Sequence, residues 1–353
     1  MSIAVRAENT LSDIERLRGW LPIDAVVRDG GPVISWLDMR DVALSEPFFF
    51  QTVERVRLER PLVREIFTGY DVLIRSEKLF AALRPSGFIF HSSRSGSTVI
   101  TNTLKALERV LTLSEPDVVD KLVSRFFTDV ADDRRRELIY AVLLRAAVNA
   151  LGQRCAGDER AYFLKFSSVS TAQIPRIAEI WPQVPAIFVY RHPIEIMVSN
   201  LNDPPRWLNQ HGDVRIAAQL IGTEEGEVGS LSQEEFCARM VAAFFRAALI
   251  KGPSLRLINY AELSLDGLMN VMRTFDLKIS VAEQQAITEV MSRYSKDRQR
   301  QRAFESDSTQ KRQLASKLVW EMAERWALDP YEQLEQKRSE QNSSGTQGTT
   351  END

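Results

Sequence analysis

Short apolar runs alternate with longer amphipathic segments from residue 87 onward, and this alternation constrains the fold more than any other feature of the chain. It is typical of a parallel sheet whose strands are joined by crossover helices. Five runs are candidate strands: residues 87–91, 110–113, 161–166, 186–190 and 255–260. The sequence therefore predicts an α/β domain in which helices flank a parallel sheet.

The segments between these runs predict helices. They cover residues 98–109, 118–128, 134–150, 171–180, 193–201, 233–250 and 264–275. Residues 201–232 differ, because they contain a Pro-Pro pair, several glycines and little sustained periodicity. A long excursion of this kind often covers a site, so a lid and an ordinary surface insertion are equally good interpretations.

Both ends of the chain differ from this α/β segment. Residues 1–85 predict a mostly helical accessory region, since Ser12 and Glu15 have capping-box spacing and an Asp-Gly-Gly-Pro turn follows at 29–32. Residues 86–334 then form the main domain. From Glu335 onward the residues are too polar to bury apolar surface, which predicts a disordered tail over 335–353.

Composition argues against several classes of protein. Lysine and arginine number 45 against 48 acidic residues, and the formal charge of −3 gives no reason to expect nucleic acid as the main partner. Cys155 and Cys237 lack metal-type spacing and are expected to be reduced thiols. The chain has no uninterrupted apolar run of about 18 residues. We therefore expect a soluble, cytoplasmic protein without a membrane partner, and the sequence does not indicate its oligomeric state.

The polar stretch after the first candidate strand has the layout of a phosphate-binding loop. A loop that enters a helix N-terminus directs backbone N–H groups and the positive end of the helix dipole at one place. In the ATP-binding pattern G-x-x-x-x-G-K-[ST], a lysine follows the second glycine. Aligning Gly96 with that glycine puts Ser97 at the lysine position and His91 at the first glycine position. The ATP-binding interpretation therefore fails at two positions.

The remaining residues of the loop suit an oxyanion. Gly96 allows close backbone approach, and Ser97 and Thr98 supply hydroxyl groups beside the first amides of the helix. Arg94 adds a permanent cation at the mouth of the loop. Taken alone, the segment could also be a serine-rich turn that simply enters a helix.

Residues 186–200 form a second candidate anion site. Arg191 ends a candidate strand, Pro193 stands at a natural helix start, and Ser199 follows eight residues after the arginine. Taken alone, Arg191 could equally make a structural salt bridge, and Ser199 could simply face solvent.

Together, the two segments resemble the sulfotransferases that use 3′-phosphoadenosine 5′-phosphosulfate (PAPS). The family's 5′-phosphosulfate loop carries a lysine or arginine, then Ser-Gly or Thr-Gly, then two hydroxyl residues, as residues 94–98 do. Its members hold the 3′-phosphate with a strand-Arg-x-Pro-helix-Ser arrangement, which matches Arg191 and Ser199. The resemblance covers roughly residues 86–330 in strand order and implies a P-loop-type fold.

The resemblance implies PAPS as co-substrate, PAP as product and a set of cofactor-binding residues. The set is Ser93, Arg94, Ser95, Gly96, Ser97, Thr98, Arg191, Ser199 and, from a late basic segment that could also be a solvated face, Lys296. The sequence departs from the family pattern at two positions. His192 stands where many members have Asp or Asn, a mild change because this residue is not the phosphate ligand. Val99 stands where cytosolic members often have an aromatic residue, and this departure favours a divergent, bacterial-type branch.

Sulfuryl transfer needs aligned reactants and cations on the leaving phosphate more than covalent work by the protein. Arg94 suits the leaving group because it stays charged at any working pH. Glu115, directly after strand 110–113, is the predicted general base at the carboxyl edge of the sheet, and His91 is the rival base. Lys165 ends a strand and either reaches the same crevice or is solvated.

No metal site is predicted, because the chain has only three histidines, His91, His192 and His211, and none stands at ligand spacing. A nucleotide-dependent kinase and a non-catalytic nucleotide-binding protein are the alternative functions. The missing loop lysine and the lack of a strand-end aspartate for magnesium argue against the kinase. The acceptor is predicted only as a hydroxyl or amine of a small molecule or glycoside.

Overall fold

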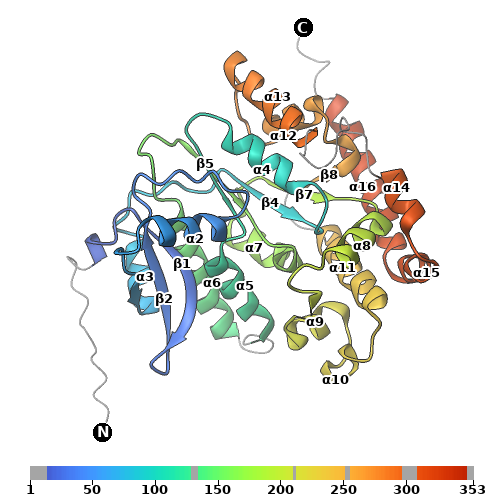
Figure 1. The fold of residues 1–353 in the computed structure, drawn as a ribbon, viewed down its shortest axis with the longest axis horizontal. Coiled ribbons are helices and arrows are strands. Elements are labelled where there is room, and N and C mark those ends of the chain that lie inside the picture. Colours follow the sequence, from blue (N-terminus) through green and yellow to red (C-terminus); the bar gives the residue numbers. More distant parts are fainter. Residues whose placement is uncertain (1–13, 129–133, 210–211, 251–254, 296–307, 348–353) are drawn as a thin grey trace. The chain divides into compact units, whose positions relative to one another are not determined.

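The computed structural model describes residues 14–128, 134–209, 212–250, 255–295 and 308–347 of the 353-residue chain. The chain divides into two compact units (Figure 1). The first comprises Met1–Pro85 and Arg109–Tyr162, and the second comprises Ser86–Glu108 and Phe163–Asp353. Residues 109–162 therefore group with the N-terminal segment in this division.

The predicted sheet is present and has five strands. They are β4 (Gly87–His91), β5 (Val110–Ser114), β6 (Ala161–Lys165), β7 (Ala186–Tyr190) and β8 (Leu255–Asn259). Their order is β5-β6-β4-β7-β8, and β4 pairs in parallel with both β6 and β7. Ile89 of β4 lies beside Lys165 on one side and Ile187 on the other. The carboxyl ends of these three strands therefore meet at one edge of the sheet.

Helices of the second unit form two groups. α4 (Ser97–Lys105), α12 (Leu265–Thr274) and α13 (Val281–Ser295) pack together. The second group consists of α8 (Pro193–Asn202), α11 (Gln233–Leu249), α14 (Ser308–Leu314), α15 (Lys317–Trp326) and α16 (Leu328–Gln347). Figure 1 shows the first group above strands β4 and β7 and the second to their right. The core between helices and sheet is built from fully buried rings such as Phe88, Phe90 and Phe188.

Shorter elements complete the second unit. The 3₁₀ turns η1 (Val169–Gln173) and η3 (Tyr260–Glu262) follow β6 and β8, and α7 (Ile174–Ile180) follows η1. The long excursion at 201–232 carries two helices, α9 (Val214–Ile221) and α10 (Glu225–Val228), which pack on each other. Its proposed role as a lid stays a prediction.

The N-terminal region is not the predicted helical accessory. It contains a three-stranded antiparallel sheet of β1 (Trp20–Arg28), β2 (Gly31–Asp38) and β3 (Ile66–Thr68). Asp29 and Gly30 join β1 to β2 with φ angles of 51° and 78°, which is the two-residue turn that the right-handed strand twist favours. The predicted turn was correct, but it closes a hairpin rather than linking helices. Ser12, half of the proposed capping box, lies outside the described residues.

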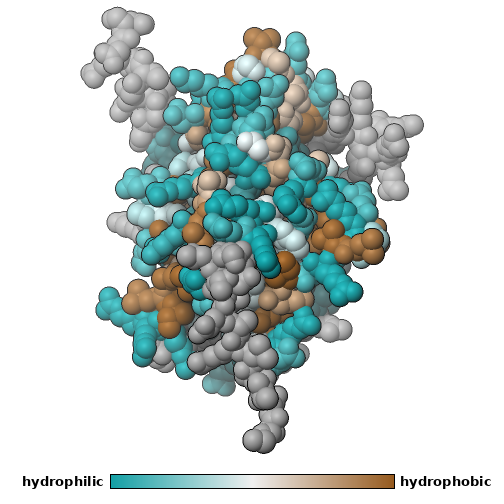
Figure 2. Space-filling model, turned by 90° about the vertical axis from the view of Figure 1, so that its left-hand side faces the viewer, coloured by the Kyte–Doolittle hydropathy of each residue, from teal (hydrophilic) through white to brown (hydrophobic). Residues whose placement is uncertain are grey.

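Four helices complete the first unit: α2 (Phe49–Glu59), α3 (Tyr70–Ser76), α5 (Asp117–Thr128) and α6 (Arg134–Leu151). α5 and α6 pack on β1, and α3 packs on α6 and β2. The same unit exposes several apolar side chains, among them Leu58 and Leu62. Figure 2 shows one face of the molecule, where hydrophobic residues reach the surface in separate groups among hydrophilic ones.

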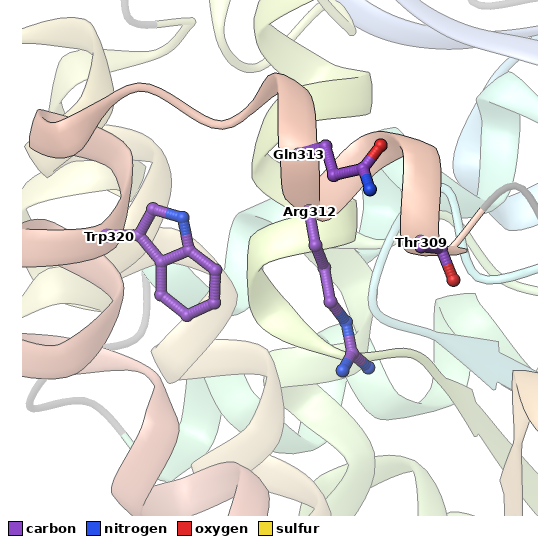
Figure 3. A pocket seen from close by; sticks show the side chains of 4 residues that line it. All are labelled: Thr309, Arg312, Gln313 and Trp320. Atoms are coloured by element: carbon purple, nitrogen blue, oxygen red, sulfur yellow. The ribbon is translucent and has the colours of Figure 1, made fainter.

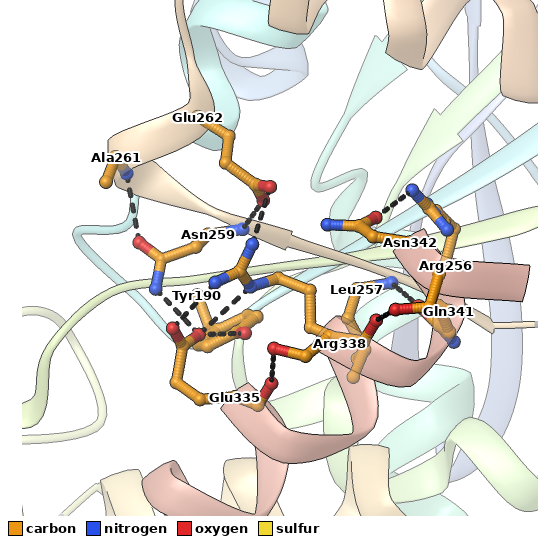
Figure 4. Close-up of polar contacts among 12 residues, drawn as sticks. Tyr190, Arg256, Leu257, Asn259, Ala261, Glu262, Glu335, Arg338, Gln341 and Asn342 are labelled. Atoms are coloured by element: carbon orange, nitrogen blue, oxygen red, sulfur yellow. Dashed lines mark hydrogen bonds and ion pairs between the residues drawn. The ribbon is translucent and has the colours of Figure 1, made fainter. Parts of the chain in front are cut away.

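The prediction of a disordered tail from Glu335 is wrong for residues 335–347, which form the second half of α16. Their polar side chains bind the ends of strands β7 and β8 (Figure 4). The Gln341 amide donates to the Leu255 carbonyl at 2.8 Å and accepts from the Leu257 N–H at 3.0 Å. Since β8 is an edge strand, this side chain satisfies backbone groups that another strand would otherwise pair with.

A second polar cluster lies one turn earlier on α16. The Glu335 carboxylate accepts hydrogen bonds from the Tyr190 hydroxyl, from Asn259 Nδ2 at 2.9 Å and from Arg338 Nη2 at 2.8 Å (Figure 4). Arg338 also donates to Glu262 at 2.6 Å. Burial alone would raise the pKa of Glu335, but these hydrogen bonds outweigh it and lower the pKa. The polar composition of the segment is thus compatible with order because its groups pair specifically.

Replacing Gln341 by alanine should lower the free energy of unfolding by about 1–2 kcal/mol, because two backbone groups of β8 lose their partner. Denaturant unfolding measures this. Gln336→Ala is the matched control on the same helix, since Gln336 bonds to the exposed Glu340. Equal losses in the two variants would contradict a role for Gln341 in protecting the edge strand.

Candidate functional site

The loop between β4 and α4 has an unusual backbone. Ser93, Arg94 and Gly96 have φ angles of 66°, 44° and 83°. Non-glycine residues rarely adopt such angles, and local strain of this kind collects at functional sites. A Cβ on Gly96 would lie 2.7 Å from Leu263 Cδ1 and 2.8 Å from Tyr260 Cδ2, so only glycine fits there. Gly96 is also the N-cap of α4, and as a glycine it has no side chain to cap the first amides of that helix.

Hydroxyl groups of the loop hold it in place. Ser93 Oγ donates to Asn200 Oδ1 at 3.0 Å, and Ser95 Oγ donates to the Val189 carbonyl at 2.9 Å. Both serines are buried. Ser93 and Ser95, predicted as cofactor ligands, therefore shape the loop through these bonds. Ser97 and Thr98, in the first turn of α4, lie beside its first amides.

Arg94 is held away from the start of α4. Its Nη2 donates to the Asp203 carbonyl at 2.6 Å and makes an ion pair with the Asp203 carboxylate. Asp203 is the C-cap residue of α8. The predicted leaving-group cation is thus engaged at the end of a neighbouring helix, and an anion at the loop must compete with that carboxylate. The sequence pattern contained no signal for this partner.

Arg191 binds a residue of α8, the helix that carries Ser199. Arg191 directly follows β7, is 3% exposed and donates through Nε to Glu195 Oε2 at 2.5 Å. Its guanidinium carbon lies 4.0 Å from the centre of the Tyr260 ring. Glu195 and Ser199 are four residues apart and so face the same way on the helix. Among the described residues, the buried Ser199 Oγ has no hydrogen-bond partner.

A second arginine joins this cluster, and the sequence did not reveal it. Arg312 Nε donates to Glu195 Oε1 at 2.8 Å, so one carboxylate, 2% exposed, lies between two guanidinium groups. Arg312 lies in a polar helix segment where charged residues are ordinary, so no pattern distinguished it. The predicted basic ligand Lys296 lies outside the described residues.

His192, between Arg191 and α8, stays neutral beside these charges. Burial is the main reason that its pKa is lowered to about 4, and the positive charge of Arg312 lowers it further. Its Nδ1 is buried without a hydrogen-bond partner among the described residues, and its ring contacts Tyr331. A neutral imidazole here avoids adding a third cation to the cluster.

The base candidates lie at strand ends. His91 ends β4, is buried, accepts from the Ser93 N–H at 3.2 Å and binds Thr171 Oγ1 through its carbonyl at 3.1 Å. Lys165 ends β6 and is 1% exposed, so the interpretation as a solvated lysine is wrong. Glu115 belongs to the first unit, where it follows β5 with a φ of 53°. Its role as base stays a prediction.

The fold was compared with proteins of known structure. The sulfotransferase STF9 from Mycobacterium avium matches 69% of this chain and 72% of its own, with 14% identity and a TM-score of 0.39. A sulfotransferase from Alicyclobacillus acidocaldarius matches 60% of this chain and 94% of its own, with 12% identity and a TM-score of 0.33. Both are bacterial sulfotransferases. No protein-family model matches the sequence, and no curated protein does.

The described residues contain neither a candidate metal site nor a membrane-spanning helix. No group of three or more His, Cys, Asp or Glu side chains in the described part of the chain could hold a metal ion. None of the helices described is long and apolar enough to cross a membrane.

The lowered pKa of His192 makes stability depend on pH. Between about 4 and 6.5, the unfolded chain protonates this histidine and the folded chain does not, so stability falls as the pH falls through this range. Wild type should lose on the order of 1–3 kcal/mol more than His192→Gln over this window, allowing for partial exposure. Denaturant unfolding at pH 7 and pH 4.5 measures the difference. Parallel pH profiles would contradict the buried, neutral histidine.

Proposed function

We propose that this protein is a sulfotransferase that takes a sulfuryl group from PAPS. The proposal is supported by two arrangements that would suit anions, at the ends of neighbouring strands. α4, whose N-cap is Gly96, follows β4, and the Arg191 cluster follows β7, which pairs with β4. A donor with phosphate groups at both the 5′ and the 3′ position requires two such places.

The loop is proposed to bind the 5′-phosphosulfate. Successive N–H groups at the start of a helix stabilise an oxyanion, and Gly96 lets a ligand approach the backbone closely. Ser97 and Thr98 add hydroxyl donors at this point. Arg94 would supply positive charge to the leaving phosphate once it exchanges the Asp203 carboxylate for the ligand.

The α8 cluster is proposed to bind the 3′-phosphate. The Arg191 guanidinium, which Glu195 holds in place, matches the geometry of a phosphate. The buried Ser199 hydroxyl, which has no partner among the described residues, fits as a donor to the same group. Lys296, the basic residue that the sequence assigned to this phosphate, stays a prediction.

When bound, PAPS supplies a sulfuryl group on an anionic phosphate leaving group. The chain's residues orient the donor and balance its charge, which is most of what such transfers require of a protein. Lys165, buried at the end of β6 beside β4, would add a cation near the loop. Glu115 is the proposed base that takes the proton of a hydroxyl or amine acceptor, and His91 is the alternative.

Binding measurements separate this proposal from its rivals. Calorimetry with PAP, ATP and PAPS should show preference for the ligands with a 3′-phosphate, and a transfer assay with labelled PAPS should show turnover. A preference for ATP would support a kinase. Tight PAP binding without transfer to any acceptor in a broad library would support a non-catalytic nucleotide-binding protein.

Arg191→Ala should weaken binding of 3′,5′-bisphosphorylated adenosine by about one to two decades, since a charge-assisted hydrogen bond is worth roughly 1.5–3 kcal/mol. Binding of adenosine 5′-monophosphate should hardly change, because it has no 3′-phosphate. Arg239→Ala is the control, as Arg239 is also paired with a glutamate and stacked on a tryptophan. Equal losses for both nucleotides would refute the assignment of the 3′-phosphate site.

Glu115→Gln should keep PAP affinity and lose most transfer activity, because glutamine preserves size but cannot accept the proton. General-base removal typically costs about 10²–10⁴ in rate. Single-turnover transfer from labelled PAPS measures the effect, with His91→Gln examined in parallel. Normal transfer by the Glu115 variant would move the assignment of the base to His91.

A further inference from the structure

A pocket of about 470 Å³ lies at α14 and α15 of the second unit. Thr309, Arg312 and Gln313 line it from α14, and Trp320 lines it from α15 (Figure 3). These side chains offer a hydroxyl, a guanidinium, a carboxamide and an indole ring. The volume falls within the range of sites for small organic ligands, which runs from about 300 to 1,000 Å³.

The lining residues specify a class of ligand. An indole face favours a planar ring, and a guanidinium binds a carboxylate or a similar oxyanion through parallel hydrogen bonds. The lining residues that the structure describes offer an entering anion one cation and two neutral polar groups. We propose that this pocket binds a small planar organic anion, with Trp320 against its ring and Arg312 on its charged group.

Arg312 is already oriented for this role. Its Nε donates to Glu195 Oε1 at 2.8 Å, and that carboxylate is almost completely buried. Long side chains on a surface usually lose conformational freedom when they bind a ligand, and this loss weakens binding. Because the buried carboxylate holds one edge of the guanidinium, less freedom remains to be lost at Arg312 than at an ordinary surface arginine.

The same carboxylate links the pocket to Arg191. Glu195 Oε2 accepts from Arg191 Nε while Oε1 accepts from Arg312 Nε. An anion in the pocket shares the charge of Arg312, and Glu195 then pairs more strongly with Arg191. Occupancy of the pocket therefore lowers the affinity of Arg191 for a 3′-phosphate. This coupling, unlike the pocket itself, depends on the proposed function.

Calorimetry with 2-naphthoate tests the pocket without any nucleotide, and neutral 2-naphthamide is the matched ligand. We expect saturable naphthoate binding with a Kd of about 1 mM or tighter and at least about tenfold weaker binding of the amide. Arg312→Ala and Trp320→Ala should each weaken naphthoate binding by at least about tenfold. Arg325→Ala is the control on α15, because Arg325 stacks on Trp326 and does not line the pocket.

Four results would overturn the pocket proposal. The first is the absence of saturable binding, and the second is equal binding of acid and amide. The third is naphthoate binding that Trp320→Ala leaves unchanged, since the ligand would then lie elsewhere. The fourth is a loss in Arg325→Ala as large as in Arg312→Ala, since it would reflect the general charge of the region.

The coupling is tested by titrating 3′,5′-bisphosphorylated adenosine with and without saturating naphthoate. Its affinity should fall severalfold, naphthoate should weaken by the same factor in the reverse titration, and the effect should disappear in Arg312→Ala. Equal affinities would overturn the coupling. If wild-type protein does not bind the bisphosphate at all, the proposed function fails and the coupling with it, while the naphthoate measurement alone decides the pocket.

Discussion

One buried carboxylate organises the charged part of the second unit. Glu195 is 2% exposed and accepts from Arg191 at 2.5 Å and from Arg312 at 2.8 Å. These residues come from α8, the end of β7 and α14, so the triad joins the carboxyl edge of the sheet to the C-terminal helices. A buried charge costs several kcal/mol unless it is paired, so Arg191 and Glu195 require each other. Arg312, whose side chain is half exposed, adds a bond from the C-terminal helices.

Helix α8 supports the loop as well as the arginine cluster. Asn200 accepts the Ser93 hydroxyl and Asp203 binds Arg94, so residues near the end of α8 hold two of the strained loop positions. Positive φ angles at non-glycine residues cost of order 1–3 kcal/mol and persist only when neighbouring contacts hold them. The loop between β4 and α4 and the Arg191 cluster therefore share one support, and a change in α8 would alter both.

Local sequence patterns predicted the central sheet well. They failed where contacts with residues distant in the sequence determine the secondary structure. Residues 87–91 and 186–190 form strands because each run is apolar along its whole length. The N-terminal hairpin was missed because helix-start spacing was given more weight than the Asp-Gly turn at residue 29. The polar segment after Glu335 is helical because its side chains pair with Tyr190, Asn259 and the backbone of β8. Composition does not contain that information.

In the candidate site, too, local spacing accounts for some contacts and residues distant in the sequence account for others. Helical spacing alone brings Glu195 and Ser199 to one face of α8, so this part of the arrangement follows from local spacing. Arg312 reaches Glu195 from 117 positions away, and Asp203 reaches Arg94 from 109 positions away, so only the folded chain reveals these partners. Arg94 is consequently bound to the Asp203 carboxylate, a contact that the residues around position 94 give no means of predicting.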